Sequence, residues 1–153
     1  MAIRISPMID QDCKEVAAFL AHALPEIWRM GGNPDADQIQ RVVSSVSSIG
    51  LVARQEGAVV GLAIGWCFSN AVAQGDAVML DELLVDPAMR GNGIGTALVD
   101  AFKKTAQHQA RTLVEVWATT DFPTEPAATP FAKTGGKKVG LLRQFDWPQE
   151  AFT

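Results

Sequence analysis

Apolar residues recur at helical spacing in two segments of the chain, and proline, acidic and glycine boundary signals predict two further helices. The first segment follows Asp10 and Asp12, and either aspartate can cap a helix. Its apolar stripe consists of Val16, Ala17, Phe19, Leu20, Ala23 and Leu24. Further helices are predicted over residues 34–46, from Ile94 onward and over residues 127–134. The stripe of the third helix consists of Ile94, Ala97, Leu98, Ala101 and Phe102.

Between these helices, runs of apolar and β-branched residues predict strands. The predicted strands cover residues 2–6, 50–55, 58–66, 77–85, 112–118, 138–142 and 143–147. Glu56-Gly57 is a hairpin turn signal, and Ser69–Asp76 is expected to be a polar connection. The order of elements predicts an α/β (α+β) fold: a mixed, mostly antiparallel twisted sheet of six to seven strands, flanked by about four helices. One parallel crossover is expected, between the strands at 77–85 and 112–118.

Length and charge limit the classes of protein that fit. The chain has 153 residues, which predicts a single domain spanning residues 1–153. A net charge of −4 argues against nucleic-acid binding and is compatible with a cationic small substrate. No apolar run approaches the roughly 20 residues of a membrane helix, and the first residues lack a secretory signal. We therefore expect a cytoplasmic protein with no membrane partner.

The two cysteines, Cys13 and Cys67, lie in a predicted helix and a predicted strand. Neither has metal-ligand spacing, so we expect reduced, buried thiols and no metal site.

Residues 90–97, Arg90-Gly91-Asn92-Gly93-Ile94-Gly95-Thr96-Ala97, lie between a predicted strand and a long predicted helix. Glycines let the backbone approach a ligand closely because they carry no Cβ. The helix that follows directs its unpaired N–H groups and its positive dipole end at this loop. The segment therefore predicts an anion site suited to phosphate or pyrophosphate. The alternative is a glycine-rich turn without a ligand.

The run Leu80-Asp81-Glu82-Leu83-Leu84-Val85-Asp86-Pro87, followed by Arg90-x-x-Gly93-x-Gly95, resembles the acyl-CoA-binding motif of the GNAT N-acetyltransferase superfamily. The resemblance implies acetyl-CoA as the donor, with its pyrophosphate on the loop amides. Those amides would belong to Arg90, Gly91, Asn92, Gly93, Ile94, Gly95 and Thr96. It also implies that Leu84 and Val85 hydrogen-bond the pantetheine like an added strand, in a splay between the strands at 77–85 and 112–118.

Glu82 lies where many GNAT enzymes place a general base, which takes a proton from the acceptor amine through water. Strand alternation predicts Glu82 and Leu84 on one face, with Asp81, Leu83 and Val85 on the other. Asp81 is the alternative base, because a β-bulge would re-aim side chains. The other alternative is that Glu82 is a solvated or salt-bridged residue of the strand and has no catalytic role.

A second GNAT motif resembles Pro130-Phe131-Ala132-Lys133-Thr134-Gly135-Gly136. The family's tyrosine, which often protonates the departing CoA thiolate, corresponds to Phe131, and the chain contains no tyrosine. Three accounts are open. The thiolate leaves without a dedicated acid, or Thr129, Thr134 or a water donates the proton, or the protein binds acyl-CoA without efficient turnover. The first is favoured because the CoA-binding motif is intact.

The last third of the chain is similar to aminoglycoside 3-N-acetyltransferases of the gentamicin/fortimicin type, which implies a polycationic acceptor and an acidic binding surface. The candidate acceptor-binding residues are Glu26, Trp28, Asp121, Glu125 and Asp146. The alternative is that these acids are ordinary solvated residues and that the tryptophan belongs to the core.

The leading hypothesis is an acetyl-CoA-dependent N-acetyltransferase that acts on a primary amine of a small cationic molecule. Polyamines, amino acids and protein N-termini are alternative acceptors. An acyl-CoA-binding sensor or pseudoenzyme, and a plain interaction domain whose loop binds nothing, are alternative functions. The sequence does not determine the oligomeric state, although proteins of this fold often pair through C-terminal strands, so a homodimer is one expectation.

Overall fold

A computed structural model describes residues 2–24, 34–71, 74–110, 112–118 and 125–135. In chain order the elements are β1 (Arg4–Pro7), η1 (Asp10–Asp12), α1 (Cys13–Ala23), α2 (Ala36–Val43), β2 (Ser48–Gln55), β3 (Ala58–Asn70), β4 (Gly75–Val85), η3 (Pro87–Met89), α3 (Ile94–Gln109), β5 (Leu113–Ala118) and α4 (Glu125–Lys133). The strands form one sheet in the order β1-β2-β3-β4-β5. Neighbouring strands are antiparallel except for β4 and β5, which are parallel.

The predicted architecture is confirmed in outline, because the sheet is mixed, mostly antiparallel and packed against helices. The described residues form five strands rather than six to seven, and the strands expected at 138–142 and 143–147 lie outside them. The β3–β4 hairpin is longer than expected. Ser69 pairs with Asp76 and Asn70 with Gly75, so half of the predicted polar connection belongs to the strands themselves.

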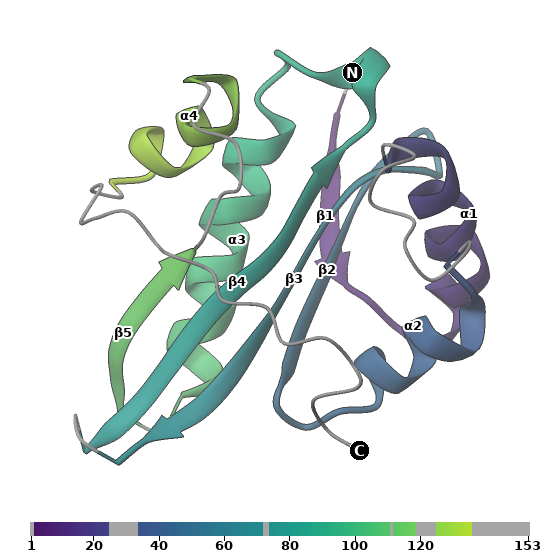
Figure 1. Cartoon of the computed structure of the whole chain (residues 1–153). Coiled ribbons are helices and arrows are strands. Elements are labelled where there is room, and N and C mark those ends of the chain that lie inside the picture. The colour runs from purple at the N-terminus through teal and green to yellow at the C-terminus, as the bar shows by residue number, and fades with distance from the viewer. Residues whose placement is uncertain (1, 25–33, 72–73, 111, 119–124, 136–153) are drawn as a thin grey trace, which may run out of the picture.

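Helices cover both faces of the sheet, as Figure 1 shows, with α1 and α2 on one side and α3 on the other. The core is accordingly divided into two clusters. One joins α1 and α2 to Val52, Val59, Leu62 and Ile64, and the other joins α3 to sheet residues such as Val78 and Leu80. In the described part of the chain, no helix is long and apolar enough to cross a membrane.

The apolar stripe of α1 is buried as predicted, but its cap differs from the expectation. Asp12 makes no side-chain hydrogen bond to the first turn of α1. Its carboxylate instead accepts hydrogen bonds from the Ile9 N–H at 2.8 Å and from Arg54 at 2.7 Å. Arg54 also donates to Glu15 at 2.6 Å. The hydrogen bonds to Glu15 and Asp12 raise the pKa of Arg54 above its ordinary value, and they tie α1 to the β2–β3 hairpin.

Helix α3 packs tightly on the sheet over Gly65. A Cβ built at Gly65 would overlap both the Met79 carbonyl oxygen and the ring of Phe102, which is 1% exposed. The apolar stripe predicted for α3 has the expected helical spacing, but one of its members differs. Ala97 is exposed, and Val99 is buried instead.

We expect Gly65→Ala to lower the free energy of unfolding by about 2–3 kcal/mol, because neither the backbone oxygen nor the packed Phe102 ring can give way. Gly50→Ala is the matched control. Its Cβ would meet the Met8 Cβ at 3.2 Å, a contact that a shift of a few tenths of an ångström relieves, whereas the Cβ at Gly65 would overlap the Met79 carbonyl oxygen. Urea unfolding of the two variants measures the difference. Equal losses would show that α3 does not pack on Gly65 as described.

Candidate functional site

The turn between β4 and α3 is shaped by its own polar groups and glycines. Asp86 begins the turn, and its carboxylate accepts a hydrogen bond from the Ala88 N–H at 2.8 Å. Gly91 and Gly93 both have φ of +80°, in the left-handed region that favours glycine. Gly93 is the N-cap of α3, so no side chain caps this helix.

The N-terminus of α3 presents a group of backbone donors. The first hydrogen bond of the helix runs from the Ala97 N–H to the Gly93 carbonyl at 3.0 Å. Within the described residues, the N–H groups of Ile94, Gly95 and Thr96 have no acceptor. A Cβ built at Gly91 or Gly93 would meet no atom within 4 Å. Three converging donors and the positive end of a helix dipole suit a phosphate or pyrophosphate group.

Strand β4 extends past the end of β5 toward this turn, as Figure 1 shows. Their pairing begins at Asp76 and Leu113 and ends at Leu80 and Ala118. Strand β4 continues to Val85, paired with β3 alone among the described residues. The carboxyl end of β4 therefore extends beyond the described part of β5, and the splay between these two strands stays a prediction.

The backbone groups on the open edge of β4 differ from those expected. The Asp86 N–H donates to the Val60 carbonyl on β3 at 3.0 Å. Because N–H and C=O directions alternate along an antiparallel strand, Leu84 also faces β3, and Leu83 and Val85 face away from it. The Val85 carbonyl accepts a hydrogen bond from Arg90 Nε at 3.3 Å. The edge available to an added strand is therefore that of Leu83 and Val85, not of Leu84 and Val85.

A β-bulge in β4 determines where its two acids point. Ile64 pairs with Glu82 and Gly65 pairs with Leu80, so Asp81 is an extra residue in the strand. Val78 and Leu80 pack with α3 before the bulge, and Leu83 and Val85 do so after it. The expected separation of Asp81 and Glu82 onto opposite faces is wrong, because the bulge interrupts the alternation that it assumed.

Both acids lie on the sheet face that α1 and α2 partly cover. Glu82 shares that face with Leu84, which packs against the α1–α2 cluster. Asp81 is placed there by a hydrogen bond of 3.2 Å from the indole N–H of Trp66 to its Oδ2 atom. Both acidic side chains are exposed, and Glu82 has an interaction partner of its own.

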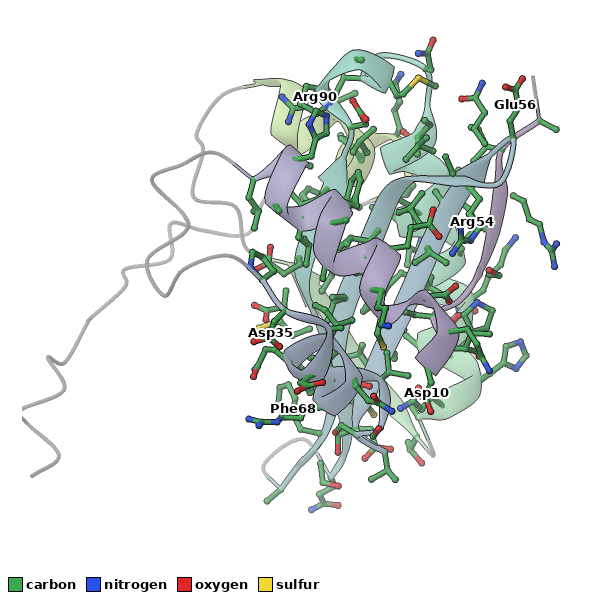
Figure 2. The ribbon with its side chains drawn as sticks, turned by 90° about the vertical axis from the view of Figure 1, so that its right-hand side faces the viewer. Asp10, Asp35, Arg54, Glu56, Phe68 and Arg90 are labelled. Atoms are coloured by element: carbon green, nitrogen blue, oxygen red, sulfur yellow. The ribbon has the colours of Figure 1, made fainter. Side chains whose placement is uncertain are left out.

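An exposed aromatic side chain lies on the same face. Alternation along β3 puts Phe68 on the side of Ile64 and Trp66, and Phe68 is 42% exposed. Figure 2 views the molecule from the α1–α2 side, with Phe68 near its lower end and Arg90 near its upper end. The acids of the bulge lie between these two positions along β4.

The residues of the second motif pack against α3. Phe131 is half-buried beside the α3 cluster, and a Cβ on Gly95 would meet Pro130 at 3.2 Å. The Thr134 hydroxyl donates to the carbonyls of the preceding turn, at 2.9 Å for Pro130 and 3.0 Å for Phe131. Thr134 is therefore a poor proton donor for a departing thiolate, since its proton is already used. Thr129 has an interaction partner.

Both cysteines are free, but only one is buried as expected. Cys13 is buried, whereas Cys67 is partly exposed. Burial raises the pKa of both thiols, and Asp76 raises that of Cys67 further. Both therefore remain protonated at neutral pH, so neither is poised to act as a nucleophile. No group of metal-ligating side chains occurs in the described part of the chain.

Most of the candidate acceptor-binding residues cannot be placed. Glu26, Trp28, Asp121 and Asp146 lie outside the described residues, and Glu125 is described only as the first backbone position of α4.

The family model described as the acetyltransferase (GNAT) family matches residues 14–136, which include the glycine loop, the bulge and the Phe131 segment. The chain belongs to the GNAT family. Members of this family take the acetyl group from acetyl-CoA, and the chain is accordingly an N-acetyltransferase. No curated protein matches the chain.

Solved structures share the GNAT fold over nearly the whole chain. An aminoglycoside acetyltransferase from an uncultured soil metagenomic sample, crystallised with sisomicin, superposes with a TM-score of 0.77 at 18% identity and covers 95% of both chains. A second such enzyme, also from an uncultured soil metagenomic sample, gives 0.78 at 23% identity, covering 97% of this chain and 99% of the other. A ribosomal-protein-alanine N-acetyltransferase from Brucella melitensis biovar Abortus 2308 gives 0.73 at 21% identity, covering 96% and 100%. At these identities the likeness shows the fold alone.

The left-handed N-cap predicts how this loop responds to a side chain. We expect Gly93→Ala to destabilise the protein by about 1–2 kcal/mol, because a Cβ is strained at positive φ even in open space. Gly93→Asn should cost less, because asparagine tolerates this conformation. Thermal unfolding of the two variants is the measurement, and an alanine variant as stable as the wild type would contradict the loop geometry.

Proposed function

We propose that this GNAT protein transfers the acetyl group of acetyl-CoA directly to a primary amine of a small cationic molecule, with Glu82 as the general base through water. The observation that carries the proposal is the bulge. It turns Glu82 outward on an accessible face, beyond the last pair of residues that joins β4 to the described part of β5. Aminoglycosides are one acceptor class that fits, and polyamines are another.

The donor would bind along two parts of the described structure. Its pyrophosphate fits the N–H groups of Ile94, Gly95 and Thr96, because they lack acceptors within the described residues and point at the loop of Gly91 and Gly93. Its pantetheine fits the open edge of β4, where the backbone groups of Leu83 and the Val85 N–H face away from β3. This edge leads from the loop toward the bulge.

The reaction needs the acceptor amine in its neutral form. An ammonium ion has no lone pair, so a proton must pass through water to the Glu82 carboxylate before the nitrogen attacks the acetyl carbonyl carbon. The new C–N bond then forms and the C–S bond breaks, and CoA leaves with the sulfur electron pair. The nitrogen loses its second proton as the amide forms, and this proton passes through water to the CoA thiolate. An exposed carboxylate can pass the proton on to solvent after each turnover.

Two features favour direct transfer without a dedicated acid. Both thiols stay protonated at neutral pH, which argues against an acyl-cysteine intermediate. Phe131 carries no hydroxyl, and that of Thr134 is bonded to its own helix. A thiol whose pKa is about 8–9 is an adequate leaving group in water. The missing hydroxyl is also the observation that favours the second candidate function, an acyl-CoA sensor with little turnover.

The polycationic acceptor is supported by the exposed acids of β4 and by the net charge of −4. It is also supported by the fold likeness to aminoglycoside acetyltransferases. A cytoplasmic location, a homodimer and a substrate role for Glu26, Trp28, Asp121, Glu125 and Asp146 remain parts of the same proposal.

We expect Glu82→Gln to lower the rate of amine-dependent thiol release by roughly 10²-fold or more, because the amide cannot accept the proton. Thiol release from acetyl-CoA is measured with a panel of aminoglycosides, polyamines and amino acids. The affinity for CoA, measured by calorimetry, should stay unchanged. Thr134→Val is the control and should keep the wild-type rate.

If no amine stimulates release by the wild-type protein, the enzyme proposal fails, whereas CoA binding without turnover would favour the sensor. Equal rates for Glu82→Gln and the wild type would remove Glu82 from the mechanism.

Phe131→Tyr tests whether a missing acid limits the rate. If thiolate departure is already fast, we expect kcat to change by less than about twofold, since a phenol would add nothing to a step that is not limiting. Single-turnover kinetics with a saturating amine provide the measurement. A tenfold or greater rise would show that the absence of the hydroxyl is a real deficit.

A further inference from the structure

Trp66 and Asp81 form a cross-strand pair beside the candidate base. Trp66 lies on β3 opposite Met79, and its indole N–H reaches across to Asp81 Oδ2 at 3.2 Å. The contact involves the extra residue of the bulge, so it fixes the one side chain whose direction the strand pairing leaves undetermined. Asp81 is adjacent in sequence to Glu82, and both are exposed on one face.

The hydrogen bond gives the two acids different surroundings. One oxygen of Asp81 is occupied by a neutral donor, and the carboxylate keeps its negative charge. Within the described residues, no cationic side chain pairs with Asp81. An indole donor orients a carboxylate without neutralising it, so the remaining oxygen can still bind a cation.

We propose that Trp66 is a positioning residue that holds Asp81 as an anchor for a second cationic group of the acceptor, while Glu82 serves the reacting amine. The proposal rests on the proposed function and specifies its acceptor class: amines that carry a further ammonium group a few bonds away. The half-exposed ring of Trp66 and the exposed ring of Phe68 add aromatic surface to the same face.

The physical basis of the selectivity is electrostatic. Two adjacent carboxylates repel each other, and a dication relieves that repulsion more fully than a monocation does. An acceptor with a single amine can satisfy Glu82 but leaves the charge of Asp81 uncompensated. The preference for dications should weaken as salt rises, because both acids are exposed.

The test compares putrescine with butylamine, which differ by one terminal amino group. For the wild-type protein we expect kcat/KM to be about three- to fivefold higher for putrescine, the effect of one added ion pair at an exposed contact. Asp81→Asn should bring the ratio close to one, mainly through KM for putrescine. Trp66→Phe, which keeps a ring but loses the N–H, should lower the ratio by about half, because Asp81 keeps its charge but loses the donor that orients it.

Two controls separate positioning from general effects. Asp100→Asn removes one exposed negative charge from α3 and should keep the wild-type ratio. The double variant of Trp66→Phe and Asp81→Asn should show the same ratio as Asp81→Asn alone, because Trp66 acts through Asp81. A purely structural role for Trp66 would instead lower the rates with both amines and add to the effect of Asp81→Asn.

Equilibrium binding of both amines to the CoA-loaded protein, measured by calorimetry, keeps the inference separate from the proposed function. Turnover without a preference for putrescine overturns the inference and leaves the function intact. A preference that survives Asp81→Asn also overturns it. Selective binding of putrescine that is lost in Asp81→Asn, in a protein without turnover, supports the anchor and overturns the proposed function.

Discussion

Strand β4 buries apolar side chains against α3 on both sides of Asp81, and this burial holds the bulge in place. Val78 and Leu80 pack there before the bulge, and Leu83 and Val85 after it. Without an extra residue, one half of the strand would turn these side chains away from the core. Full burial of one such side chain stabilises a fold by about 1.5–3 kcal/mol. The position of two exposed acids is therefore secured by hydrophobic contacts on the opposite face.

In the proposed function, the same strand gives the donor and the acceptor separate places. Its open edge, with Leu83 and Val85, leads to the loop and the start of α3, while the outward face at the bulge carries the acids. An extended donor along the edge and an amine approaching from the α1–α2 face would then meet near residue 82. Gly95 packs closely against Pro130, and this contact places α4 beside the first turn of α3, next to the glycine loop.

Local patterns predicted the parts of this arrangement that depend on neighbouring residues. The conformation of the glycine loop, the hairpin turn at Glu56-Gly57 and the start of α3 are confirmed. Positive φ angles and helical periodicity depend on residues that are close together in the sequence, so local patterns suffice to predict them. Predictions that assumed unbroken periodicity were less accurate. The separation of Asp81 from Glu82 and the choice of Leu84 as an edge residue both depended on counting along β4. The cap predicted for α1 differed because a distant cation, Arg54, attracts Asp12.

The sequence by itself determined the family, which the match over residues 14–136 shows, and the motif around residues 80–95 supplied the candidates for the donor site and the base. Tertiary structure decided which face the acids share, which backbone edge is open and that Trp66 holds Asp81. The physical reason is that a bulge is defined by two strands together. Its extra residue exists only relative to the pairing of β3 with β4, and that register depends on burial against α3.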